Sequence, residues 1–136
     1  AFKPEEWTER GRPIIRIQNL NGGGEFNHYD KPLPSQYVIP PGCLLFSWSG
    51  NRGTSFGPFI WTGPEGVLNQ HIFRVTPKRQ IVPEWLYCAL DHVRQQAERD
   101  AHGGSGLVHV RRADMEAYRV AQPDEAEQAR IVRVIQ

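Results

Sequence analysis

The spacing of hydrophobic residues changes near position 83, and this change constrains the fold more than any other feature. Before it, short apolar runs are separated by Gly- and Pro-rich breaks, a pattern typical of strands joined by turns. The predicted strands span residues 13–20, 37–39, 43–48, 59–61 and 67–75. After it, apolar residues recur at spacings of four, three and four, which indicates one face of a helix beginning at Pro83. The residues of this face are Leu86, Leu90, Val93 and Ala97.

Shorter elements are expected after this helix. The helical pattern ends at residues 102–104, where two glycines follow a histidine, and residues 107–110 have the character of a strand. Residues 113–118 are expected to form one helical turn.

A last helix is predicted to begin near Asp124. Asp124 with Glu127 matches a capping box, in which each side chain accepts a hydrogen bond from a free backbone N–H group. Its apolar stripe consists of Ile131, Val132 and Ile135. About 13 residues with one such stripe make a marginal helix in isolation, so we expect it to dock on the domain or to continue in a longer protein.

Length and composition fit one α+β domain. A chain of 136 residues buries one core but not two. We predict a mainly antiparallel β core with one packed amphipathic helix and a C-terminal helix. Cys43 and Cys88 lie in apolar surroundings and are interpreted as small buried hydrophobes. With no apolar run of about 20 residues and no signal-peptide pattern at the start, the expected location is the cytoplasm.

The positive charge lies in the first part of the chain. Residues 10–79 carry eight Lys and Arg against three acidic residues, whereas residues 81–136 carry seven Arg against nine acidic residues. A polyanion should therefore meet the first part, although a solvated surface of uneven charge explains the same numbers.

Motifs that would indicate catalysis are missing from the sequence. We find no [ND]-P-P-[FYW] loop for a flipped base, no Walker A segment, no G-x-S-x-G elbow and no strand–G-x-G-x-x-G–helix unit. The five His lack metal-ligand spacing. We therefore expect no catalytic residue, no metal and no cofactor.

Six segments in order resemble the specificity subunits of type I restriction-modification systems. They are GRPIIRIQNL at 11–20, PPGCLLFSWSG at 40–50, WTG at 61–63 with LNQHIFRV at 68–75, WLYCAL at 85–90, HGGSG at 102–106 and PDEAEQARIV at 123–132. Each alone is common, but six in this order are fairly specific. Cys43 stands where the family has Asp, and Asp124 stands where it has a second Pro.

The resemblance implies a division of labour between subunits. A specificity subunit has two recognition domains, each reading one half of a split DNA site, held apart by helices. This chain would be one target-recognition domain, residues 1–122, followed by the start of a spacer helix, residues 123–136. The implied partners are double-stranded DNA, an adenine methyltransferase (modification) subunit, a restriction/translocase subunit, and a second recognition domain or second copy, with no membrane. Catalysis would lie in the partner subunits.

Residue chemistry suggests which side chains touch DNA. Arg and Lys suit guanine and phosphates, and Asn and Gln suit adenine. The DNA-binding candidates are Arg16, Gln18, Asn51, Arg52, Thr54, Lys78, Arg79, Arg111 and Arg112. Arg16 and Gln18 are expected on one face of a strand, and residues 49–55 are expected to form a flexible loop. The alternative for all nine residues is that they are solvent-exposed side chains without a contact to DNA.

Two further groups of residues receive other roles. Asn69-Gln70-His71 is shared across a family whose members read different sequences, so we expect hydrogen-bonded structural roles there. The four Trp are expected in the core and sheets. For the C-terminal helix, the candidate partner-binding residues are Gln128, Ile131, Val132 and Ile135.

Two other classes of protein remain open from the sequence. One is a protein–protein interaction module that docks through the C-terminal helix. The other is a small hydrolase or nuclease, since catalytic triads are set by geometry rather than by motif.

Overall fold

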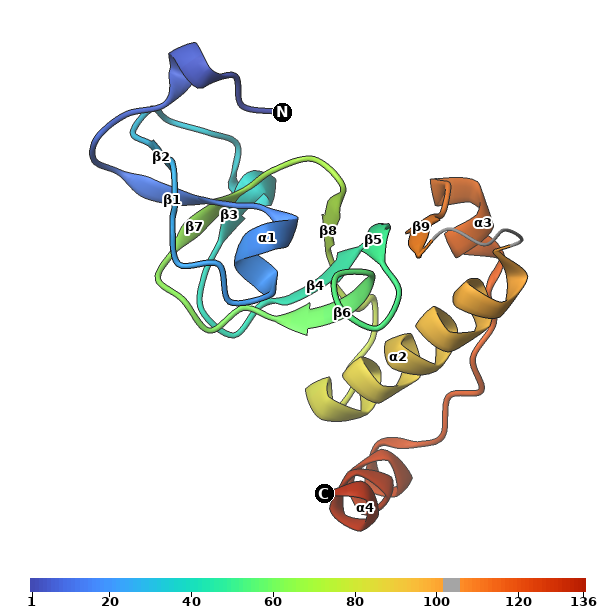
Figure 1. The fold of residues 1–136 in the computed structure, drawn as a ribbon. Coiled ribbons are helices and arrows are strands. Elements are labelled where there is room, and N and C mark those ends of the chain that lie inside the picture. The colour runs from blue at the N-terminus through green and yellow to red at the C-terminus, as the bar shows by residue number, and fades with distance from the viewer. Residues whose placement is uncertain (102–105) are drawn as a thin grey trace.

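Short strands dominate the first half of the chain and helices the second (Figure 1). The computed structural model describes residues 1–101 and 106–136. The strands are β1 Arg12–Ile15, β2 His28–Tyr29, β3 Val38–Ile39, β4 Leu44–Ser47, β5 Ser49–Asn51, β6 Gly57–Ile60, β7 Gly66–Leu68, β8 Ile72–Arg74 and β9 Leu107–His109. The helices are α1 Ile17–Leu20, α2 Pro83–Asp100, α3 Arg112–Ala117 and α4 Glu125–Ile135, with 3₁₀ turns η1 Pro4–Glu6 and η2 Ser35–Tyr37.

The strands form three sheets. One has the order β2-β1-β7-β3, the second β6-β4-β8, and the third pairs β5 with β9. Every pairing is antiparallel except that of β1 with β7. The α+β class with a mainly antiparallel core is therefore confirmed.

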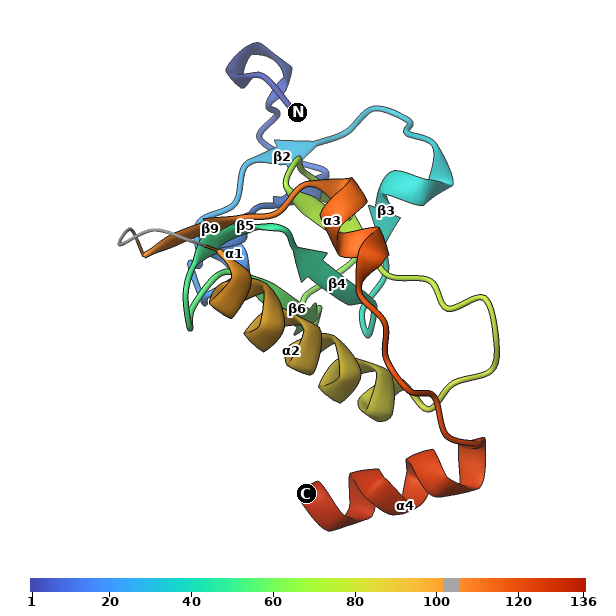
Figure 2. The same ribbon diagram turned by 90° about the vertical axis from the view of Figure 1, so that its right-hand side faces the viewer.

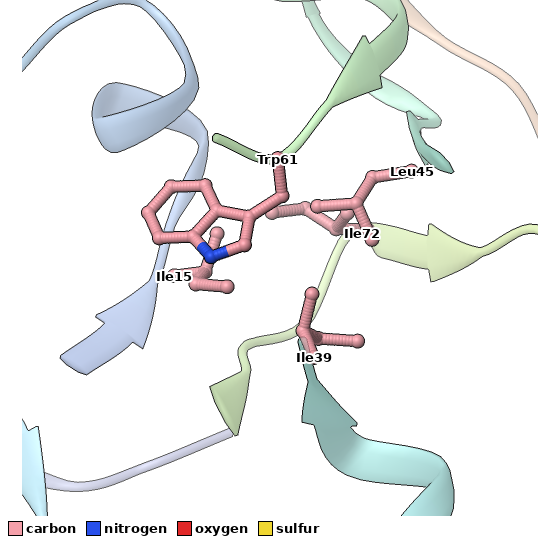
Figure 3. Packing of buried hydrophobic residues seen from close by; sticks show 5 residues of the cluster. All are labelled: Ile15, Ile39, Leu45, Trp61 and Ile72. Carbon is pink, nitrogen blue, oxygen red and sulfur yellow. The ribbon is translucent and has the colours of Figure 1, made fainter. Parts of the chain in front are cut away.

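One apolar cluster joins the two larger sheets (Figure 3). Ile15 and Ile39 come from the four-stranded sheet, whereas Leu45 and Ile72 come from the three-stranded sheet. Trp61, directly after β6, packs among them and donates its indole N–H to the Pro64 carbonyl at 2.7 Å. Because each sheet contributes side chains to the same cluster, the two sheets form one body.

A second apolar cluster joins the three-stranded sheet to α2 and to β9. It consists of Phe46, Phe56, Ala97, Val108 and Val110. The helix α2 lies against β6 in both views (Figures 1 and 2). The predicted helix from Pro83 is thus confirmed, with Val93 and Ala97 buried and Leu86 and Leu90 half-buried. Its predicted end at 102–104 lies outside the described residues.

The strand predicted for 13–20 is wrong in its second half. The chain leaves β1 at Ile15, and α1 begins at Ile17. Asn19 explains the change, because its side chain is buried and accepts from the Arg16 N–H while donating to the carbonyls of Gly23 and Glu25. These local bonds replace strand pairing. Gln18 therefore lies on a helical turn, so the expected strand face shared by Arg16 and Gln18 does not exist.

The strand predicted for 67–75 is two strands in different sheets. β7 belongs to the four-stranded sheet and β8 to the three-stranded sheet. Between them His71 has a φ of 70°, in the left-handed region. This turn carries the chain from one sheet to the other. The sequence did not indicate the turn, because the apolar residues of 67–75 were interpreted as one strand.

The C-terminal helix α4 docks on the domain, which is one of the two alternatives expected from the sequence. Asp124 accepts from the Glu127 N–H at 2.9 Å, which confirms its capping role. The Glu127 carboxylate binds Arg130 instead of completing a capping box. α4 lies against α2 (Figure 2).

Both cysteines are free and half-buried. Burial raises the pKa of the Cys88 thiol, in keeping with a packing role. Of the helices within residues 1–101 and 106–136, none combines the length and apolar character needed to cross a bilayer.

Candidate nucleic-acid interface

The strands β5 and β9 form a two-stranded ribbon with one buried face. Ser49 pairs with His109, Gly50 with Val108, and Asn51 with Leu107. Gly50 and Val108 are buried against the domain. Since successive side chains alternate between faces, the partners on either side of them form the outer face. We call this outer face, made of Ser49, Asn51, Leu107 and His109, the ribbon face.

The turn after β5 is compact. The Asn51 carbonyl accepts from the backbone N–H groups of Thr54, Ser55 and Phe56, and the Ser55 hydroxyl accepts from the Asn51 N–H at 2.7 Å. A Cβ at Gly50 would lie 2.6 Å from the Ser55 hydroxyl oxygen and 2.7 Å from the Ser55 carbonyl carbon. The flexible loop expected at 49–55 is therefore wrong, because its first residues form a strand and the rest fold onto Asn51.

Arg52 anchors the ribbon to the end of α2. Its guanidinium donates to the Ala101 carbonyl at 2.8 Å, and its backbone N–H donates to the Gly106 carbonyl at 2.8 Å. Cations stabilise the carbonyl end of a helix in this way. Arg52 thus has a structural role and remains exposed.

A group of rings braces the base of the ribbon. The Trp48 ring centroid lies 4.9 Å from that of His109, 4.7 Å from that of His71 and 5.9 Å from that of Phe73. His71 belongs to the turn before β8 and His109 to β9, so the rings connect two sheets. The Trp48 ring therefore limits the orientations that His109 adopts on the ribbon face.

The Asn69–His71 turn departs from the expected hydrogen-bonded role. Its backbone is bonded, since Asn69 donates to the Ile15 carbonyl and the His71 carbonyl accepts from Trp48. In the described part of the chain, however, Asn69 Oδ1 and His71 Nδ1 are buried and have no hydrogen-bond partner. Buried polar atoms are normally paired, so this turn combines unusual backbone geometry with two unmet bonds.

Arg16 and Gln18 lie at α1. The Arg16 guanidinium carbon lies 4.7 Å from the centroid of Trp7, and Arg16 also donates to Asn27. Trp7 is 38% exposed, so the expected core position is wrong for this residue. Trp48 is half-buried. Trp61 and Trp85 are buried, as expected.

The predicted DNA-contacting residues fall on more than one side of the molecule. The segments carrying Arg16, Gln18, Asn51, Arg52 and Thr54 lie on the face toward the viewer in Figure 1. The β8–α2 connection, with Lys78 and Arg79, lies on the opposite side, as Figure 2 shows. The two groups therefore do not share one face.

Arg111 and Arg112 lie at the start of α3, and both are paired within that helix. Arg111 binds Asp114 at 2.9 Å and Arg112 binds Glu116 at 2.7 Å, all four side chains being largely exposed. The hydrogen bond from Arg111 lowers the pKa of the Asp114 carboxyl. The two arginines therefore add little net charge to their surroundings.

The four residues proposed for partner binding divide between the two faces of α4. Gln128 is 1% exposed, accepts from the Val82 N–H at 2.9 Å and donates to the Pro123 carbonyl at 2.8 Å. Val132 is buried too, and Ile131 is half-buried. Ile135 is 57% exposed, beside Val134 at 77%. Gln128 and Val132 thus hold α4 to this domain, and the outward apolar residues are Val134 and Ile135.

Sequence reasoning did not select Ser49, Leu107 and His109, which the structure places beside Asn51 on the ribbon face. The signal was the alternation Leu107-Val108-His109-Val110, with Val108 and Val110 buried and the other two exposed. The partner strand β5 was hidden because Gly50 and Arg52 suggested a loop.

Comparison with known proteins adds two findings. A family model described as "Type I restriction modification DNA specificity domain" matches residues 1–136. The type I restriction enzyme EcoBI specificity subunit of Escherichia coli is 30% identical over 77 residues. That match covers 55% of this chain and 15% of the E. coli subunit, so the chain corresponds to a small part of that relative.

Proposed function

The chain belongs to the family of type I restriction modification DNA specificity domains, and from this membership we propose that it reads the sequence of double-stranded DNA. It would act as one target-recognition domain of a specificity subunit and read one half of a bipartite site. The observation that carries the proposal is the match of the family model over residues 1–136. The grouping of α1 and the β5–β6 turn on one face supports it, because base reading and phosphate contact need adjacent side chains.

The proposed partners follow from the same role. An adenine methyltransferase subunit and a restriction/translocase subunit would carry the bond-making chemistry, and a second recognition domain or second copy would read the other half-site. We expect this complex to work in the cytoplasm and the chain itself to catalyse nothing. Residues 1–122 would form the recognition domain, and α4 would begin the spacer helix.

The DNA-contacting set that we propose is smaller than the sequence suggested. Arg16, Gln18, Asn51, Arg52 and Thr54 remain as one group. Lys78 and Arg79 lie on the far side, where we assign them no contact with the same duplex.

An exchange of domains tests the proposal. In the full specificity subunit assembled with its methyltransferase, residues 1–122 are replaced by the corresponding segment of a subunit that reads a different site. The N6-methyladenine motif is then mapped in the host genome. We expect one half of the motif to change to that of the donor. An unchanged motif in an assembled, active complex would overturn the proposal.

The exposed apolar end of α4 favours a second candidate function, a protein–protein interaction module. Val134 and Ile135 present this surface. Replacing both by Ser, Val134→Ser and Ile135→Ser, should weaken co-purification with the methyltransferase subunit and leave the motif unaltered. If the exchange of residues 1–122 leaves the motif unaltered while these two changes abolish assembly, the interaction module is the better description.

A further inference from the structure

We propose that the β5–β9 ribbon enters the major groove and that Asn51 and Leu107 together read one A·T base pair, with His109 contacting a neighbouring pair. This inference rests on the proposed function and names the element that performs it. It goes beyond a basic surface, since it assigns base contacts to three residues of the ribbon face: Asn51, Leu107 and His109.

The ribbon has the right shape for the groove. The major groove of B-DNA is about 12 Å wide and admits a two-stranded antiparallel ribbon. With Gly50 and Val108 buried beneath, the ribbon cannot turn over, so the ribbon face is the side that meets DNA. In Figure 1 the ribbon lies between α1 and α3, at the same face as α1.

The chemistry of the Asn51–Leu107 pair matches an A·T pair. The two residues are direct cross-strand partners, so their Cβ atoms lie about 5 Å apart. A side-chain amide makes a bidentate contact with adenine N6 and N7, and an aliphatic side chain contacts the thymine methyl group. Leu107 is 58% exposed, so its aliphatic side chain is accessible on the ribbon face.

The Asn51 amide is available for such a contact. Its backbone N–H and C=O are both used in the turn. Its side chain makes no hydrogen bond to any residue in the ranges 1–101 and 106–136, and it is exposed. A hydrogen-bonding group that is held by its backbone and free at its tip reaches a base without breaking an existing bond.

The ribbon is also held in place before DNA arrives. Arg52 ties its turn to the Ala101 carbonyl, the Ser55 hydroxyl binds the Asn51 N–H, and Trp48 packs on the His109 ring. A pre-organised element loses less conformational entropy on binding, which favours discrimination by a few contacts.

The test compares point variants in the full specificity subunit assembled with its methyltransferase. Asn51→Ala, Leu107→Ala and His109→Ala are each assayed by anisotropy competition with duplexes in which every base pair of the half-site is changed in turn. Gln36→Ala, another exposed side-chain amide on η2, is the matched control. Circular dichroism melting checks that each variant is folded, and Asn51→Ser and Leu107→Met serve as milder replacements.

We expect Asn51→Ala and Leu107→Ala to relax the same A·T position. The preference for that pair should fall roughly 5- to 150-fold for Asn51→Ala, the range of one good bidentate contact. His109→Ala should relax an adjacent position, and Gln36→Ala should change nothing.

Three results would overturn the inference. The first is unchanged base preference in folded Asn51→Ala and Leu107→Ala variants. The second is relaxation of two separate positions by Asn51→Ala and Leu107→Ala. The third is a uniform loss of affinity at all positions, which would mean a phosphate contact. None of these removes the proposed function, which fails only if exchanging residues 1–122 leaves the motif unaltered.

Discussion

Individual residues hold parts of this fold together through close contacts with neighbouring backbone. Gly50 is one, because its missing side chain lets the backbone of Ser55 approach the strand. Gln128 is another, because one buried amide satisfies the Val82 N–H and the Pro123 carbonyl across two helices. Both positions tolerate little change, and each gives a prediction at the scale of one side chain.

Gly50→Ala should destabilise the domain by about 1–3 kcal/mol, the usual cost of forcing an extra methyl group into a packed site. The new Cβ would lie 2.7 Å from the Ser55 carbonyl carbon, so the backbone must move. Urea denaturation gives the free energy of unfolding. Gly24→Ala is the control, since nothing lies within 4 Å of a Cβ there. Equal stability of the two variants would show that the turn does not require glycine at position 50.

Gln128→Ala should lower the free energy of unfolding by about 1–3 kcal/mol, because it leaves the half-buried Val82 N–H and Pro123 carbonyl without partners. Gln122→Ala changes an exposed glutamine close by and should have almost no effect. Thermal and urea unfolding measure both. If Gln128→Ala unfolds like the unaltered protein, the docking of α4 on α2 does not depend on this amide.

At the scale of elements, α2 shows why some parts of the fold are predictable. Its apolar spacing and Pro83 predicted its start correctly. The strands were harder to bound, because a short apolar run does not reveal where it changes sheet. Asn19 and His71 decide the breaks after β1 and β7 through one buried side chain and one left-handed residue. The ribbon face was missed for a similar reason, since its two strands lie far apart in the sequence.

Acid should weaken α2 through Asp91. A hydrogen bond from Arg94 at 2.7 Å lowers the pKa of the Asp91 carboxyl in the folded state. A carboxyl with a lowered folded-state pKa contributes stability above its unfolded pKa of about 3.9 and loses it as the pH falls through the folded value.

The melting temperature of the unaltered protein should therefore fall more between about pH 6 and about pH 3 than that of Asp91→Asn. Asp30→Asn, which replaces an exposed carboxyl, is the control. If the melting temperatures of Asp91→Asn and the unaltered protein fall in parallel with pH, ionisation of Asp91 does not contribute to the stability of the folded protein.

For the whole molecule, the net positive charge is small. The formal net charge is +1, and ion pairs occupy Arg12, Arg111 and Arg112. Because most non-specific DNA affinity comes from neutralising phosphates, this domain should hold DNA weakly alone.

We expect the isolated chain to bind duplex DNA only feebly in anisotropy titrations at low salt, and the assembled complex to bind far more tightly. The reason is that a few base contacts discriminate between sequences but supply little of the total affinity. Tight, sequence-specific binding by the isolated chain would contradict this view of shared affinity.

The apolar cluster in Figure 3 has a consequence for local unfolding. Ile15 and Ile39 face Leu45 and Ile72 across it, so the two larger sheets share this interior. Segments that share one interior open as a cooperative unit in native-state hydrogen exchange. The amides of β1 and β4 should accordingly lose their protection at the same denaturant concentration, although their strands belong to different sheets.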